Sequence, residues 1–160
     1  MKRRLLILAL AAAPLLAEIR PAWAQTAAQP ELPKEKLTII TRDGKRHEFN
    51  VEMALTPEQQ TVGLMFRKEV PPDGGMLFDW GAPRDSTMWM RNTVSALDMI
   101  FINADGRIRR IVENTVPESL AIIDSGGPVR ATLELAAGTA RRLAIHVGDK
   151  VEQRVLERAS

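Results

Sequence analysis

Alternating apolar and polar residues predict a series of short strands along the chain. Residues 49–53 alternate in this way, and the Asp43-Gly44 turn before them predicts a hairpin with residues 37–41. Residues 97–102 are almost continuously apolar, as in a central strand that is covered on both faces.

Two further strands follow from the same patterns. Asp105-Gly106 is a turn that leads into residues 107–112, where Ile108 and Ile111 fall on opposite faces and so predict a bulge near Arg109-Arg110. Residues 129–135 alternate and predict a half-buried strand. Its polar face would carry Arg130, Thr132 and Glu134.

Helices are predicted to be few and short. Thr56 caps a helix in which Pro57 takes the first position and Gln59 closes a capping box, and this helix should run to about Met65. A second short helix is predicted within residues 137–145.

Between the helices, residues 76–80 and 87–91 are predicted as two strands separated by a turn at 81–83. The fold class is therefore mainly β. We expect a compact antiparallel β-sandwich or barrel with one or two short helices.

Residues 1–24 are predicted to be a secretory signal peptide. Basic residues at 2–4 precede an apolar run at 5–17, and Ala22-Trp23-Ala24 matches a signal peptidase site. The run is shorter than the roughly 20 residues of a membrane-spanning helix. Cleavage before Gln25 would place the protein in the periplasm or outside the cell, without a stable membrane anchor. We expect residues 25–36 to be a flexible linker and residues 37–160 to form a single β-rich domain.

Charge and cysteine content exclude two classes of protein. Four of the 22 basic residues and one of the 20 acidic residues lie in the predicted signal peptide, which leaves 18 and 19. No basic block remains that would bind nucleic acid. The chain has no cysteine, so no disulfide can stabilise an exported domain.

Several ordered blocks of residues form a pattern between residues 49 and 155. They are Gly63-Leu64-Met65 with Arg67, Gly75-Met76-Leu77-Phe78, Met88-Trp89-Met90 with Asn92-Thr93, Leu97-Asp98 with Phe101, Glu134-Leu135, Gly138 and Gly148-Asp149. This pattern resembles the family called domain of unknown function 192 (DUF 192). The resemblance implies a compact β-rich sandwich or barrel, often exported, with no established activity.

The region from Trp80 to Asp98 holds the candidate binding site. Asn92, Thr93 and Asp98 bracket a turn and could offer an amide, a hydroxyl and a carboxylate to a small polar ligand. The same residue types often bond nearby backbone groups in turns, which is the structural alternative. The predicted ligand-binding residues are Trp80, Trp89, Asn92, Thr93, Asp98 and Arg67. Ion pairs near this site could also involve Arg67, Arg91 and Glu134. The ordinary alternative is that these charged side chains are solvated at the surface.

Three methionines suggest a soft-metal site. Met88 and Met90 would share one face of a strand, with Met76 nearby, and paired thioethers are ligands for Cu(I) or Ag(I). His47 or His146 could complete such a site. The alternative is that these methionines fill gaps in the core. No other cofactor is implied.

Enzyme motifs are absent from the sequence. It has no cysteine nucleophile, no Gly-x-Ser-x-Gly elbow, no histidine pair at zinc spacing and no phosphate-binding glycine loop. Asp79 and Asp98 could hydrolyse a glycoside if their carboxyls lay roughly 5–9.5 Å apart. The leading hypothesis is a non-catalytic domain that binds a small molecule, a glycan or a protein. A soft-metal carrier and a carboxylate-dependent hydrolase are the alternatives.

Overall fold

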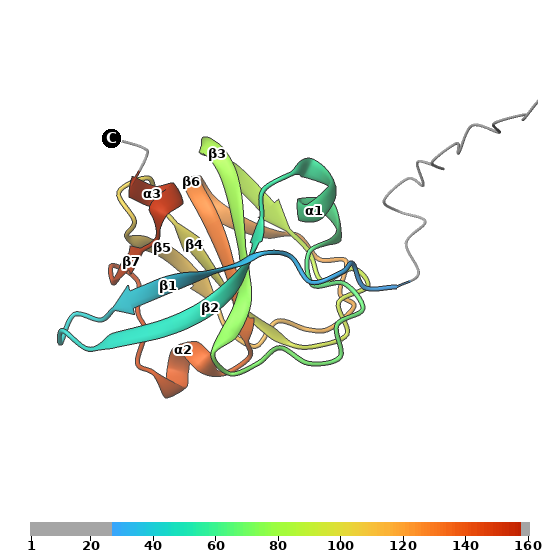
Figure 1. Cartoon of the computed structure of the whole chain (residues 1–160), viewed down its shortest axis with the longest axis horizontal. Coiled ribbons are helices and arrows are strands. Elements are labelled where there is room, and N and C mark those ends of the chain that lie inside the picture. The colour runs from blue at the N-terminus through green and yellow to red at the C-terminus, as the bar shows by residue number, and fades with distance from the viewer. Residues whose placement is uncertain (1–26, 158–160) are drawn as a thin grey trace, which may run out of the picture.

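A computed structural model describes residues 27–157, which form seven strands and three short helices (Figure 1). The elements are β1 (Lys34–Ile40), β2 (Arg46–Ala54), α1 (Pro57–Val62), β3 (Gly74–Met88), β4 (Leu97–Ile102), β5 (Ile108–Val112), β6 (Ile123–Ala136), α2 (Thr139–Arg142), β7 (Lys150–Glu152) and α3 (Arg154–Glu157). The prediction of a mainly β fold is confirmed. The predicted signal peptide lies outside the described residues. Within residues 27–157, no helix has the length and apolar character needed to cross a membrane.

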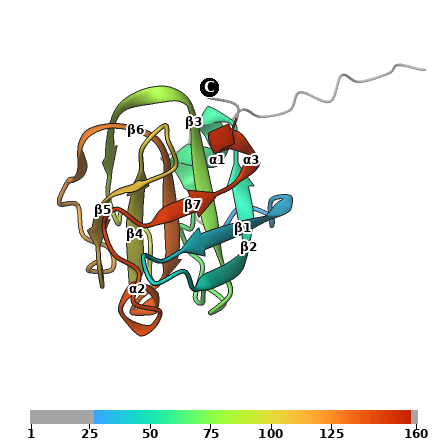
Figure 2. The ribbon, with the colours of Figure 1, turned by 90° about the vertical axis from the view of Figure 1, so that its left-hand side faces the viewer.

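All seven strands belong to one curled sheet, in the order β5-β4-β6-β3-β2-β1-β7. The two ends of this sheet approach each other, because β7 pairs with β1 and a bridge joins Arg107 to Lys150 beside β5. The backbone N–H of Val151 also donates to the carbonyl of Gly106 at 2.8 Å. Figure 2 shows β7 between β1 and β5. The sheet therefore closes toward a barrel.

One strand pair departs from the antiparallel arrangement. β2 and β3 run parallel, because the chain between them crosses over through α1 instead of making a hairpin turn. The predicted capping box of α1 is present: the Thr56 side chain accepts from the backbone N–H of Gln59, and the Gln59 side chain accepts from the backbone N–H of Thr56. The helix ends at Val62, earlier than predicted, because Gly63 follows with a φ of +50°.

β3 is one long strand where two were predicted. Its pairing with β6 shifts register between Asp79 and Arg84 and again between Asp85 and Thr87. The predicted turn at 81–83 is therefore an irregularity through which the strand continues. β3 ends at Met88, so the prediction of a strand over residues 87–91 is wrong.

The two faces of the sheet contact two separate core clusters. The inner cluster contains Leu77, Ile100 and Leu133, and the outer cluster contains Met76, Phe78 and Met99. The outer cluster also includes Leu64 from the segment after α1 and Met90 from the loop after β3. Successive residues of β3, β4 and β6 therefore point to different clusters, as strand geometry requires.

The prediction that residues 129–135 are half-buried is wrong. Arg130, Thr132 and Glu134 are all buried, as are the apolar residues between them. The reason is that the polar face of β6 belongs to the outer side of the sheet, where segments outside the sheet pack against the outer cluster, including Leu64 after α1 and Met90 after β3.

The folded chain begins before Leu37. β1 starts at Lys34, and the Gln29 side chain donates to the carbonyls of Gln59 and Gly63 at 3.1 and 2.9 Å. The backbone N–H of Leu32 donates to a carboxylate oxygen of Glu52 at 2.8 Å. These hydrogen bonds join part of the predicted linker to the domain.

Gly106 lies in the turn between β4 and β5 and allows β7 to approach this turn. Its φ is +76°, and a Cβ at this position would lie 2.7 Å from the carbonyl oxygen of Val151. Gly44 is a matched control, since its φ is +81° and a Cβ there would contact nothing within 4 Å.

We expect Gly44→Ala to lower the free energy of unfolding by about 1–2 kcal/mol through backbone strain alone. Gly106→Ala should lower the free energy of unfolding by a further ~1–3 kcal/mol, because β7 must shift. Urea denaturation of both variants measures the difference, and equal losses would contradict this role of Gly106.

Candidate functional site

A pocket of about 530 Å³ lies on the outer side of the sheet, between α1, β3, β6 and the loop after β3. Its wall is mainly apolar and aromatic. Apolar and aromatic lining residues include Met65, Phe78, Trp80, Met88, Trp89 and Ile122. The volume and the lining suit a small organic ligand.

The sheet fixes one side of this pocket. Phe78 and Trp80 stack with ring centroids 5.8 Å apart, and the indole N–H of Trp80 donates to the hydroxyl of Thr132 at 3.2 Å. The guanidinium of Arg84 lies 4.4 Å from the centre of the Trp80 ring. These contacts hold Trp80 in one orientation.

The other side of the pocket is exposed. Trp89 follows the end of β3 and is 43% exposed, with the guanidinium of Arg91 at 5.4 Å from its ring centre. Ile122 is also exposed and lines the pocket from the segment before β6. Large apolar side chains that remain exposed around a hollow are typical of a binding surface.

Glu134 of β6 also lines this pocket. Its neighbours across the strands are Met76 on β3 and Met99 on β4, and both are fully buried. Glu134 itself is only 4% exposed, and its carboxyl makes no hydrogen bond or ion pair within residues 27–157. Burial raises the pKa of this carboxyl to about 8, so at neutral pH it is mostly protonated.

Sequence reasoning named Glu134 as a possible ion-pair partner near this site but did not include it among the ligand-binding residues. The alternation along residues 129–135 assigned it to a solvated face, and the packing of Leu64 and Met90 on that side of the sheet is not visible in the pattern. Glu134 also belongs to one of the blocks that resemble DUF 192.

The structure brings three of the predicted ligand-binding residues together. Trp80, Trp89 and Thr93 line the same pocket as Glu134. Asn92 is adjacent: its side-chain nitrogen lies 3.8 Å from the sulfur of Met65, and its φ is +55°.

Asp98 lies apart from this pocket. Its carboxylate is fully buried and accepts hydrogen bonds from the backbone N–H groups of Asn114, Gly138 and Ala140 at 2.9, 3.1 and 2.8 Å. This geometry is that of the structural alternative, in which Asp98 holds neighbouring loops. Asp79 of the hydrolase hypothesis forms an ion pair with Arg130.

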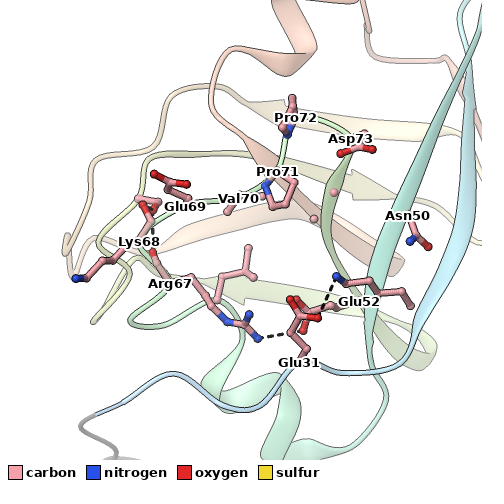
Figure 3. Close-up of a pocket in the computed structure, with 15 residues that line it drawn as sticks. Glu31, Asn50, Glu52, Arg67, Lys68, Glu69, Val70, Pro71, Pro72 and Asp73 are labelled. Carbon is pink, nitrogen blue, oxygen red and sulfur yellow. Dashed lines mark hydrogen bonds and ion pairs between the residues drawn. The ribbon is translucent and has the colours of Figure 1, made fainter.

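Arg67 lines a second hollow of about 880 Å³, shown in Figure 3. Its guanidinium donates to Glu52 at 3.1 Å, and Lys34 pairs with Glu31 at 3.2 Å. Although this hollow is the larger one, these charged groups are paired with each other. The buried Nε of Arg67 lacks a hydrogen-bond partner within the described residues, but Arg67 remains partly exposed. We therefore regard the pocket that contains Glu134 as the better candidate.

The methionines of the soft-metal hypothesis belong to the outer core cluster. Met76 and Met90 are buried there, and Met88 is partly buried beside them. Trp89 and Met90 lie beyond β3, so the strand alternation that paired Met88 with Met90 does not apply. Residues 27–157 hold no group of three or more His, Cys, Asp or Glu side chains arranged to hold a metal ion. A soft-metal site stays a prediction.

The family resemblance can now be set against known proteins. A family model, DUF192, described as an uncharacterized ACR, matches residues 38–153. The chain belongs to the DUF192 family. No curated protein matches it.

Two solved structures of other proteins are similar to this DUF192 protein. One, from Sinorhizobium meliloti 1021 and described as a proposed transcription regulator, is 48% identical, with a TM-score of 0.77 over 80% of this chain and 99% of its own. The other, from Novosphingobium aromaticivorans DSM 12444, is described as a protein of unknown function. It is 41% identical, with a TM-score of 0.74 over 82% of this chain and 96% of its own.

Burial of Glu134 predicts a pH dependence of stability. The ordinary carboxyl pKa of 4.5 applies to the unfolded chain and a pKa of about 8 to the folded chain, so the folded state binds more protons between these values. The free energy of unfolding should therefore fall as pH rises through this window, by about 1.4 kcal/mol per pH unit from this group. Glu134→Gln should remove that slope. Urea unfolding gives the free energy of unfolding of both proteins between pH 5 and 8. The difference between the two curves isolates the contribution of Glu134, because the other titrating groups are common to both proteins. Parallel curves would show that Glu134 is ionised in the folded protein.

Proposed function

We propose that this DUF192 protein is an exported, non-catalytic binding protein that holds a small organic molecule in the pocket between α1, β3 and β6. The observation that carries this proposal is Glu134, a buried carboxyl without a protein partner that lines an apolar and aromatic pocket. An unpartnered buried polar group costs free energy, and a ligand that bonds to it recovers part of that cost.

The surroundings of Glu134 support a ligand of limited size. The pocket volume lies within the range of roughly 300–1,000 Å³ that is usual for small-molecule sites. Trp80 is held by Phe78 and Thr132, so one wall is formed before a ligand arrives. A preformed wall reduces the entropy lost on binding.

The alternative functions have weaker support. A metal carrier would have to use methionines that lie in the outer core cluster. A hydrolase built on Asp79 and Asp98 would have to use carboxylates that already bond to Arg130 and to three backbone N–H groups. A role in transcription regulation, which is proposed for the S. meliloti protein, receives no support from the charge of this chain, since its residues 25–160 hold 18 basic and 19 acidic side chains.

Export is proposed from the leader sequence. The basic residues at 2–4, the apolar run and Ala22-Trp23-Ala24 together support secretion. Intact mass measurement of the protein recovered from the periplasm should give a chain that begins at Gln25. Recovery of the uncleaved chain from the cytoplasm alone would contradict export.

Filling the pocket tests the binding function. Thr61 is exposed on α1 and lines the pocket, whereas Glu58 is exposed on the same helix and does not line it. We expect native mass spectrometry of the protein from its own cells to detect a copurifying small molecule. Thr61→Trp should reduce its occupancy at least about tenfold, or roughly 1.4 kcal/mol, because the added indole occupies the pocket.

Glu58→Trp is the matched control and should retain the molecule. Absence of any small molecule from the native protein, or equal occupancy in the two variants, would argue against a ligand in this pocket.

A further inference from the structure

We propose that the ligand of this pocket is an organic cation, in which an ammonium or guanidinium group pairs with Glu134 and an apolar body contacts the aromatic wall. This inference rests on the proposed binding function and adds the chemical class of the ligand. The juxtaposition that supports it is a buried acid beside Phe78, Trp80 and Trp89.

Among the described residues, the groups that line the pocket near Glu134 offer no free cation to an anionic ligand. From β3, Arg84 lines the pocket, but its guanidinium lies over the Trp80 ring. From α1 and the loop after β3, the polar lining residues are the neutral Gln60, Thr61 and Thr93. Glu134 is the acid among the lining residues, and an anionic ligand beside it would hold it in the protonated form, so that no ion pair could form there.

The residues that flank Glu134 within the sheet are also uncharged. Met76 of β3 and Met99 of β4 lie opposite it. Arg130, four residues earlier on β6, is already paired with Asp79. No cation among the described residues therefore pairs with Glu134, and a cationic ligand could form that pair as the carboxyl loses its proton.

The tryptophans favour a cation as well. Arg84 and Arg91 each place a guanidinium near an indole ring, at 4.4 and 5.4 Å from the ring centres. These contacts show that both rings attract positive groups through their electron-rich faces. A ligand cation between a carboxylate and an indole would gain both interactions.

A cationic ligand and a neutral ligand should differ in the pH dependence of their affinity, because only the cation requires Glu134 to lose its proton. The protonated acid must lose its proton when an ammonium group pairs with it, so binding releases one proton to solvent. The affinity for a cation should therefore rise with pH until Glu134 is ionised in the free protein. A neutral hydrogen-bond acceptor would bind the protonated acid instead, and its affinity would fall as pH rises.

Three small probes of similar shape test this difference. They are 2-phenylethylammonium, 2-phenylethanol and phenylacetate, measured by titration calorimetry with the full chain between pH 6 and 8. We expect the ammonium probe to bind best and to gain about tenfold in affinity per pH unit, with release of one proton. Glu134→Gln should weaken the ammonium probe at least tenfold and leave the alcohol within about twofold.

A second variant, Arg84→Gln, tests the inference independently in case Glu134→Gln does not fold. Arg84 is exposed, so Arg84→Gln should fold normally and should remove a competing cation from the Trp80 ring. We expect it to raise the affinity for the ammonium probe by about two- to fivefold. Near-ultraviolet circular dichroism checks the fold of both variants.

The outcomes distinguish the ligand class from the binding function. If the alcohol binds as well as the ammonium probe, and its affinity falls with pH, the organic cation is wrong and a neutral-ligand site remains. If phenylacetate binds best, the charge argument is also wrong. If none of the probes binds while native protein still carries a molecule that Thr61→Trp excludes, the cation inference fails but the binding function stands.

Discussion

The position of β6 within the sheet constrains the rest of the structure. β6 is hydrogen-bonded to β3 on one side and to β4 on the other, and both of its faces are covered. Every polar side chain on its central part must therefore find a partner in the interior or remain unpaired. Arg130 pairs with Asp79 and Thr132 accepts from Trp80, whereas Glu134 has no such partner within residues 27–157. The candidate site thus follows from strand order as much as from the residues that line it.

Local features of the fold could be predicted from the sequence because their causes are local. The hairpin at Asp43-Gly44 and the capping box of α1 depend on residues a few positions apart. The bulge near Arg109 also follows from nearby residues: Phe101 pairs with Arg110 and Ile102 with Ile108, which leaves Arg109 as the additional residue. The family blocks indicated the same fold class.

Nonlocal features could not be predicted in this way. Alternation along β6 shows that its residues face two sides, but not that Leu64, some 70 residues before Glu134 in the chain, packs on the polar side. The continuation of β3 through residues 81–83 likewise depends on pairing with β6. For the candidate site, the sequence indicated Trp80, Trp89 and Thr93 as one group. Asp98 shows the opposite case, since a turn carboxylate has the same sequence pattern whether it contacts a ligand or three backbone N–H groups.

The two tryptophans have an optical consequence. The sequence has three tryptophans and no tyrosine, and Trp23 lies in the predicted signal peptide. Trp80 and Trp89, the tryptophans of the described chain, both line the candidate pocket. Once the leader is removed, nearly all of the intrinsic fluorescence of the protein therefore originates at this pocket. Trp80 is restrained by Phe78 and Arg84 and Trp89 is half-exposed, so the two indoles should emit at different wavelengths and report separately on its wall and its mouth.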